Sequence, residues 1–242
     1  MADSGQFLTM RGLVRGMKRR ETVVPAIVLG TLAFGAFVFL WIAGAVAKGS
    51  MRAVDERLFL ALRSAADPAG PFGPPWLEEA ALEITALGGY TLIVLTLAVV
   101  VGLLLLTRRW GPALYAVLSV GSGALLTHIL KGYFARPRPD LVTHLDTVHT
   151  ASFPSGHAVV GTVAYLTLAA LVMRFFDDLR VRVYVAFVAL FISLLVGVSR
   201  VYLGVHWPSD VAAGWALGLA WASLSWLLVA IIQRGANGRR KG

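Results

Sequence analysis

Long stretches without a charged residue alternate with short polar and basic segments along this chain. Four of them, each of 20 to 25 residues, can cross about 30 Å of hydrocarbon as helices: 23–47, 84–107, 111–130 and 211–232. Two shorter ones, 158–173 and 183–199, have 16 and 17 residues and span only if polar neighbours at their ends continue the helix. The pattern predicts an all-α polytopic membrane protein, a single domain over residues 1–242 with six transmembrane helices in a bundle.

The composition supports a membrane protein. Hydrophobic residues make up 57% of the chain and charged residues 14%, against about 25% charged residues in an ordinary soluble domain. The chain has no cysteine, which excludes disulfides and thiolate metal sites. A metal at any site would therefore have to be held by histidines and carboxylates.

The basic residues test the orientation of the six predicted spans. With the N-terminus inside, 14 of the 22 Lys and Arg residues fall on the inner side, as expected for cytoplasmic loops. This predicts that both termini are cytoplasmic, with an N-terminal segment at 1–22 and a basic tail at 234–242. The net charge of +9 lies in short clusters between apolar stretches, which membrane topology explains without a nucleic-acid partner.

Residues 48–83 form the first predicted outer loop, and its start has the pattern of a short helix in the membrane interface. One side of that helix would carry Val54, Leu58, Ala61 and Leu62. Asp55, Glu56 and Arg63 would point elsewhere.

Polar residues that a membrane scaffold does not need collect at the ends of the later predicted spans. They occupy residues 131–157, after the third span and before the fourth, and residues 199–210, between the fifth and sixth. Spans three and five run outward and spans four and six return. Both segments therefore meet on the outer face, where we expect the active site.

The start of the fourth span has the features of an anion site. Ser155 is a candidate N-cap, so free backbone N–H groups and the positive end of the helix dipole would face the outer loop. Gly156 allows a phosphate oxygen to approach the backbone closely. Lys131, Arg138 and Arg200 could neutralise the remaining oxygens.

Two histidines supply candidate chemistry for phosphoryl transfer. His206 lies just before Pro208, near the start of the sixth span, and Asp210 follows four residues after it. A carboxylate at that distance can accept a hydrogen bond from one ring nitrogen and leave the other as a nucleophile. His157, at the start of the fourth span, is the candidate acid for the leaving oxygen.

These residues together resemble the three-part signature of the type 2 phosphatidic acid phosphatase superfamily. The match comprises Lys131-x6-Arg138-Pro139, Pro154-Ser155-Gly156-His157 and Ser199-Arg200-x5-His206-x3-Asp210, in the family's order. The resemblance implies a two-step displacement without metal or other cofactor, with His206 as nucleophile, Asp210 as its orienting partner and His157 as acid and then base. It also implies that the phosphoryl group is bound by Lys131, Arg138, Ser155, Gly156 and Arg200.

The leading interpretation is an integral membrane phosphatase for lipid phosphate monoesters or diphosphates, such as phosphatidate, phosphatidylglycerol phosphate or undecaprenyl diphosphate. We expect it in a bacterial inner or cell membrane, with its site on the periplasmic or extracellular face. One alternative is an enzyme like the vanadium haloperoxidases, against which six spans argue. The other is a non-catalytic lipid-phosphate transporter or scaffold, which would not need nucleophile, acid and carboxylate together. The pattern chooses neither the lipid nor an oligomeric state.

Several other polar residues have simpler explanations. His128, three residues before Lys131, could support the site, but packing or a hydrogen bond within the bundle is the favoured explanation. Arg136, outside the signature, is a weaker candidate for a head-group contact. His144, Asp146 and His149 could be metal ligands, but loop polarity accounts for them and no metal site is predicted.

Overall fold

The structure is a computed structural model that describes residues 4–64, 70–142, 144–148 and 150–239. Among these residues eight segments are α-helical and none is a strand. In chain order they are α1 (Ser4–Ala47), α2 (Arg52–Leu60), α3 (Pro75–Ala86), α4 (Tyr90–Leu106), α5 (Trp110–Phe134), α6 (Gly156–Val172), α7 (Leu179–Tyr202) and α8 (Pro208–Arg239). The predicted all-α bundle is confirmed.

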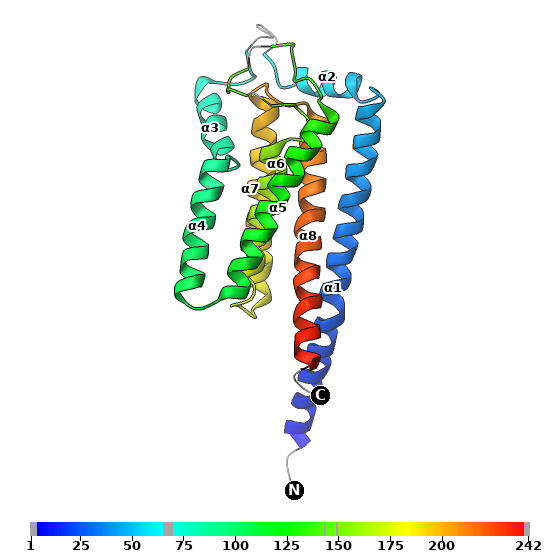
Figure 1. The fold of residues 1–242 in the computed structure, drawn as a ribbon, viewed down its shortest axis with the longest axis vertical. Coiled ribbons are helices and arrows are strands. Elements are labelled where there is room, and N and C mark those ends of the chain that lie inside the picture. The colour runs from blue at the N-terminus through cyan, green and yellow to red at the C-terminus, as the bar shows by residue number, and fades with distance from the viewer. Residues whose placement is uncertain (1–3, 65–69, 143, 149, 240–242) are drawn as a thin grey trace.

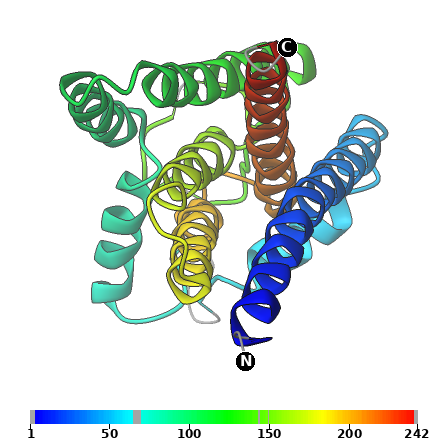
Figure 2. The same ribbon diagram turned by 90° about the horizontal axis from the view of Figure 1, so that it is seen from below.

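Helix α6 forms the centre of the bundle. Seen along the bundle axis, the longer helices surround it (Figure 2), and most of its residues are buried. Its valines Val159, Val160 and Val163 pack with Phe39 of α1 and Val120 of α5 in one apolar core. A helix buried on every side must be apolar on every side, which explains its uniformly apolar sequence.

The contact between α6 and α8 is close because α8 carries glycines where the two helices meet. A Cβ atom at Gly218 would lie 2.6 Å from Thr162 Cβ, and one at Gly214 would lie 2.7 Å from Ala158 Cβ. Small residues four positions apart let two membrane helices approach closely. This packing brings the first turn of α8 against the first turn of α6, where the Ser155 N–H donates to the Asp210 carbonyl at 3.0 Å.

The number of membrane crossings agrees with the prediction only in part. Within the part of the chain that the structure describes, four helical stretches are long and apolar enough to cross a membrane: Val23–Ala47, Trp110–Phe134, Leu179–Tyr202 and Pro208–Ala236. Helices α3 and α4 meet at a 46° bend and add a fifth crossing only if the two together count as one span. The predicted continuous span 84–107 is broken at this bend. Helix α7 exceeds the predicted 183–199 because polar neighbours at both ends continue it. The 17 residues of α6 are shorter than these spans, so a sixth crossing stays a prediction.

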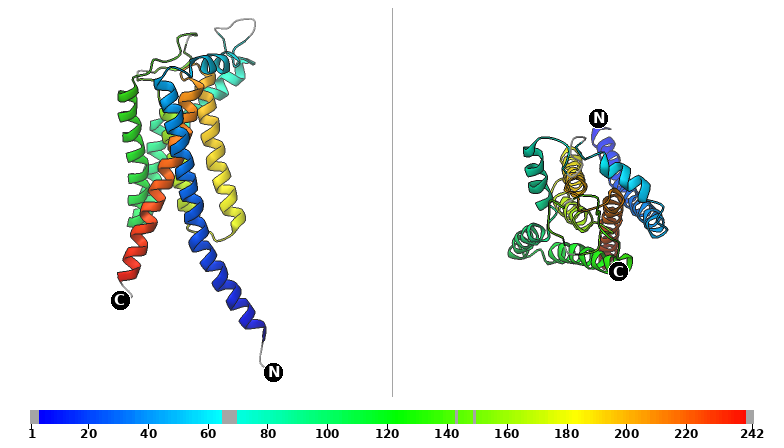
Figure 3. Two further views of the ribbon diagram at one scale, coloured as in Figure 1. Left: turned by 90° about the vertical axis from the view of Figure 1, so that its right-hand side faces the viewer. Right: turned by 90° about the horizontal axis from the view of Figure 1, so that it is seen from above.

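The helix ends that carry the motifs lie together. The C-terminal ends of α5 and α7 and the N-terminal ends of α6 and α8 meet at one end of the bundle (Figure 1). Both chain termini lie at the opposite end, where α1 extends beyond the other helices (Figure 3). The last helix continues to Arg239, so most of the predicted tail at 234–242 is helical.

Helix α2 lies across the motif-bearing end of the bundle (Figure 1), in the predicted outer loop. Its Val54 and Leu58 are exposed, as a helix in the membrane interface requires. The helix ends at Leu60, before the predicted Ala61 and Leu62. Of the three charged residues expected to point away from the apolar side, Asp55 and Arg63 face protein and are 1% and 6% exposed, whereas Glu56 stays partly exposed. Burial of these charges is the feature that the helical pattern alone did not indicate.

Candidate active site

A cavity of about 310 Å³ opens at the end of the bundle where the motifs meet. Six of the eight predicted site residues line it: Lys131, Arg138, Gly156, His157, Arg200 and His206. Ser155 precedes Gly156, and Asp210 lies behind the His206 ring, 3.5 Å from its Nδ1 atom. Residues from α5, α6, α7 and α8 and the segments between them are therefore brought to one place.

The ring of His206 is held in one tautomer by its neighbours. It lies between α7 and α8 and is 2% exposed, with Nε2 only 3.3 Å from Arg138 Nη1. A guanidinium group can only donate, so Nε2 must accept and the ring proton must sit on Nδ1. Nδ1 faces the Asp210 carboxylate, which leaves the lone pair on Nε2 at the cavity.

The Asp210 carboxylate is itself fixed by three donors. Oδ2 accepts from the Trp207 backbone N–H at 2.9 Å and from the hydroxyl of Ser152. Oδ1 accepts from Arg136 Nη1 at 2.6 Å. A fully buried carboxylate needs such partners because water cannot solvate it. The same bonds set the direction in which Asp210 faces His206.

The start of α6 has the properties expected of an anion site. Ser155 occupies the N-cap position with extended backbone angles, but its side chain makes no capping bond. Its Oγ is buried and has no hydrogen-bond partner among the described residues. A Cβ atom at Gly156 would lie 3.4 Å from the Tyr90 hydroxyl and 3.6 Å from Lys131 Cε. The Ser155 hydroxyl therefore lies unpartnered at the N-terminus of α6, the end of a helix that favours an anion.

Three cations surround this position. Lys131 donates through Nζ to the backbone carbonyl of Ala151, and Arg138 donates to the Thr150 carbonyl at 2.8 Å. Burial, and to a smaller extent repulsion from Arg200, lowers the pKa of the Arg138 guanidinium to about 10. The group therefore stays charged at neutral pH.

Arg200 is the most deeply buried of the three cations, at 1% exposure. Its Nη1 binds Asp146 at 2.6 Å and the Thr85 hydroxyl at 2.9 Å, and its Nε has no partner among the described residues. A charged group with a spare buried donor beside a cavity is suited to an oxyanion.

Four residues at or behind the site were missed or underrated from the sequence. Arg136 binds the Asp210 carboxylate rather than a head group, and Asp146 pairs with Arg200 rather than being an ordinary loop residue. Asp55 was expected only to point away from the apolar side of its helix, and Ser152 was given no role. A buried charge carries no local signal, although the position of Arg136 two residues before Arg138 could have drawn attention to it.

The remaining histidines named from the sequence are His128, His144 and His149. His128 was expected inside the bundle, which is wrong: it is exposed on α5 and borders the cavity. His144 Nε2 lies 2.7 Å from the Pro139 carbonyl oxygen, and Asp146 pairs with Arg200. Both residues therefore have a partner within the protein. His149 lies outside the described residues.

The sequence profile described as the PAP2 superfamily matches residues 112–234, slightly more than half of the chain. The chain belongs to the PAP2 superfamily. The resemblance read from the motifs is thereby confirmed, and this PAP2 protein is a phosphoric ester hydrolase embedded in a membrane.

Individual relatives agree with this assignment. Phosphatidylglycerophosphatase B of Bacillus subtilis is 34% identical over 187 residues, which are 75% of this chain and 86% of that protein. The crystal structure of a transmembrane PAP2 type phosphatidylglycerolphosphate phosphatase from Bacillus subtilis matches with a TM-score of 0.71 and 30% identity, covering 84% of this chain and 97% of the other. An undecaprenyl-diphosphatase of Sulfolobus acidocaldarius is 40% identical over 72 residues, 30% of each chain.

The environment of His206 in this PAP2 protein predicts an unusual titration. Burial removes the water that would stabilise the imidazolium and lowers the pKa of His206 to about 3, against a smaller opposing effect of Asp210. In detergent-solubilised protein with isotope-labelled histidine, the His206 ring should keep its neutral chemical shifts down to about pH 5, well below the ordinary histidine pKa of about 6.5. That resonance should be absent from His206→Asn. A His206 titration midpoint near 6.5 would contradict the prediction.

Proposed function

We propose that this PAP2 protein is a lipid phosphatase that works without metal through a phosphohistidine at His206. The observation that carries the proposal is the arrangement around the ring: the proton sits on Nδ1 toward Asp210, and the Nε2 lone pair faces the cationic cavity. A neutral, oriented imidazole beside an anion site is an activated nucleophile for phosphorus.

The first step forms the Nε2–P bond and breaks the bond from phosphorus to the ester or anhydride oxygen. His157, at the first turn of α6, starts this step as the imidazolium and donates its proton to the departing oxygen. In the second step His157 takes a proton from water, whose oxygen attacks phosphorus, and the Nε2–P bond breaks. His206 and His157 return to their starting states, and inorganic phosphate leaves.

The charge that develops on the phosphoryl oxygens would be bound by the remaining motif residues. Ser155 Oγ and Arg200 Nε are buried and have no hydrogen-bond partner among the described residues, which supports a role as ligands of the phosphoryl oxygens. Lys131 and Arg138 donate hydrogen bonds to backbone carbonyls and would replace some of them by hydrogen bonds to the phosphate. The hydrogen bond from Arg138 Nη1 to His206 Nε2 would also break as the phosphorus approaches.

A lipid is the proposed substrate because of where the cavity opens. Tyr90 of α4 and His128 of α5 border it and are exposed on helices with many exposed apolar residues. A substrate whose tail stays in the bilayer could reach the site between these helices. Since the Bacillus subtilis relative, which matches 75% of this chain, is named a phosphatidylglycerophosphatase, phosphatidylglycerol phosphate is our first candidate. Phosphatidate and undecaprenyl diphosphate follow.

The catalytic claim predicts activity without metal. Purified protein should release phosphate from at least one of the three lipids in the presence of EDTA, because the cavity supplies its cations as side chains. His206→Asn should lower kcat by at least about 10³-fold through loss of the nucleophile. His144→Gln, a histidine change in the same outer region, should retain activity.

Strict dependence on an added metal, or an active His206→Asn, would rule out this mechanism. Lipid binding without hydrolysis of any lipid phosphate would instead favour the transporter or scaffold. Oxidation of halide that depends on added vanadate would favour an enzyme like the haloperoxidases.

We also propose that both chain termini are cytoplasmic and that the cavity faces the periplasm or the cell exterior, as the distribution of Lys and Arg indicates. The chain lacks cysteine, so single cysteines can report each side. In intact cells a membrane-impermeant maleimide should label Ser50→Cys, at the cavity end, and should label Thr107→Cys only after permeabilisation. The reverse pattern would invert the orientation.

A further inference from the structure

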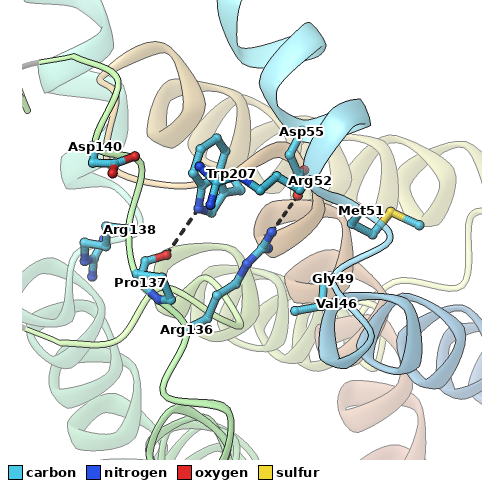
Figure 4. Close-up of a pocket in the computed structure, with 10 residues that line it drawn as sticks. All are labelled: Val46, Gly49, Met51, Arg52, Asp55, Arg136, Pro137, Arg138, Asp140 and Trp207. Carbon is cyan, nitrogen blue, oxygen red and sulfur yellow. Dashed lines mark hydrogen bonds and ion pairs between the residues drawn. The ribbon is translucent and has the colours of Figure 1, made fainter.

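Arg136 lies between two buried carboxylates, one on α2 and one on α8. Its Nη2 donates to Asp55 Oδ2 at 2.7 Å and its Nη1 donates to Asp210 Oδ1 at 2.6 Å. The Asp55 and Asp210 side chains are 1% and 0% exposed, and that of Arg136 is 14% exposed. Figure 4 shows Arg136 pointing away from its own segment toward Asp55, beside a cavity of about 220 Å³.

Asp55 also binds the start of α8. Its Oδ1 accepts from the Ser209 backbone N–H at 2.8 Å, and its Oδ2 accepts from the Ser209 hydroxyl at 2.6 Å. The first N–H groups of a helix have no partner within that helix, so a side chain from α2 here replaces an N-cap of α8. Asp55, Arg136 and the Ser209–Asp210 turn are therefore joined in one closed hydrogen-bonded set.

Helix α2 is held in place on both sides of Asp55. Phe59 is fully buried and packs on Trp207, with ring centroids 5.6 Å apart. Beyond the helix, Arg63 Nη2 donates to the carbonyls of Val201 and Tyr202 at the end of α7, each at 3.0 Å. Asp55 is thus presented at a fixed position by contacts independent of its own bonds.

The charges in this set have a consequence for His206. One guanidinium shared by two carboxylates leaves a net charge of −1, whereas a guanidinium bound to Asp210 alone would leave that pair neutral. When Nε2 forms a bond to phosphorus while Nδ1 keeps its proton, the His206 ring becomes positively charged. A negatively charged partner close by, in a region of low dielectric, stabilises that charge. Asp55 would keep that negative charge available at Asp210.

We infer that Asp55 and Arg136 are positioning residues for phosphoryl transfer: through Asp210 they set the orientation and the electrostatic support of His206. This inference rests on the proposed phosphohistidine mechanism. Neither residue borders the cavity that holds the predicted phosphate ligands, so they act through Asp210 and not on substrate.

The test uses Asp55→Asn in the full-length protein. The amide oxygen of asparagine can still accept from the Ser209 N–H, so the helix cap is retained while the negative charge is lost. We expect kcat to fall about tenfold, the lower end of the effect found for partners that orient metal-binding histidines, with KM changed less than twofold. Glu56→Gln is the matched control: Glu56 is the next residue of α2, and it pairs with Arg52 at 2.7 Å in a more exposed position.

Rapid quenching with a labelled lipid phosphate separates positioning from folding. The amplitude of trapped phosphoenzyme counts folded sites, and its rate constant reports the chemical step. In Asp55→Asn the amplitude should match that of the wild type and the rate constant should fall. Arg136→Lys, which keeps the charge but cannot donate from two nitrogens to two carboxylates, should behave in the same way.

An unchanged rate constant in Asp55→Asn would overturn the inference, as would a lower amplitude with an unchanged rate constant. If Asp55→Asn does not fold, the same measurement on Arg136→Lys decides, and failure of both to fold would assign the pair to structure alone. Failure of the proposed function looks different: the active wild-type protein would then trap no phosphoenzyme.

Discussion

The buried carboxylate of Asp210 is the point on which the rest of the site depends. It accepts bonds from the Trp207 backbone, the Ser152 hydroxyl and the Arg136 guanidinium, and it faces Nδ1 of His206. These donors come from the turn before α8 and from the segment between α5 and α6. One desolvated charge thus fixes two segments relative to each other, because leaving any of its bonds unmade inside the protein is costly.

Helix packing determines where that carboxylate lies. The glycines of α8 let its backbone approach α6 closely, which sets the start of α8 beside the start of α6. The start of α6 at Ser155 and the pair of His206 and Asp210 are consequently neighbours through the rigid core of the bundle. Sites held by helices are more precise than sites held by loops alone. Lys131, Arg138 and Arg200 line the cavity beside these groups.

The sequence was sufficient to predict the all-α bundle, the common end at which the motifs meet and six of the residues that line the cavity. Apolar stretches and motif spacings are local properties, and topology brings the helix ends together. The partners of buried charges are not local: Asp55 and Ser209 are 154 positions apart, and Asp146 and Arg200 are 54 apart. A charged residue on a short helix is usually solvated, so its pattern does not reveal which ion pair buries it.

The break between α3 and α4 was also beyond the pattern of hydropathy. Residues 84–107 are uniformly uncharged, but a Cβ atom at Gly88 would lie 2.3 Å from Val196 Cγ1, so the chain passes α7 too closely for any side chain there. Similarly, the burial of α6 on all sides explains how a helix of 17 residues can form the centre of the bundle. Both features depend on neighbouring helices, which hydropathy does not describe.

The central claim is that Nε2 of His206 attacks phosphorus. The most direct measurement is mass spectrometry of protein quenched at alkaline pH during turnover, combined with identification of the phosphorylated ring nitrogen. The account predicts a phosphoryl group on His206, attached at Nε2, with none on His157 or His128. A phosphoryl group on Nδ1 or on another residue would contradict it.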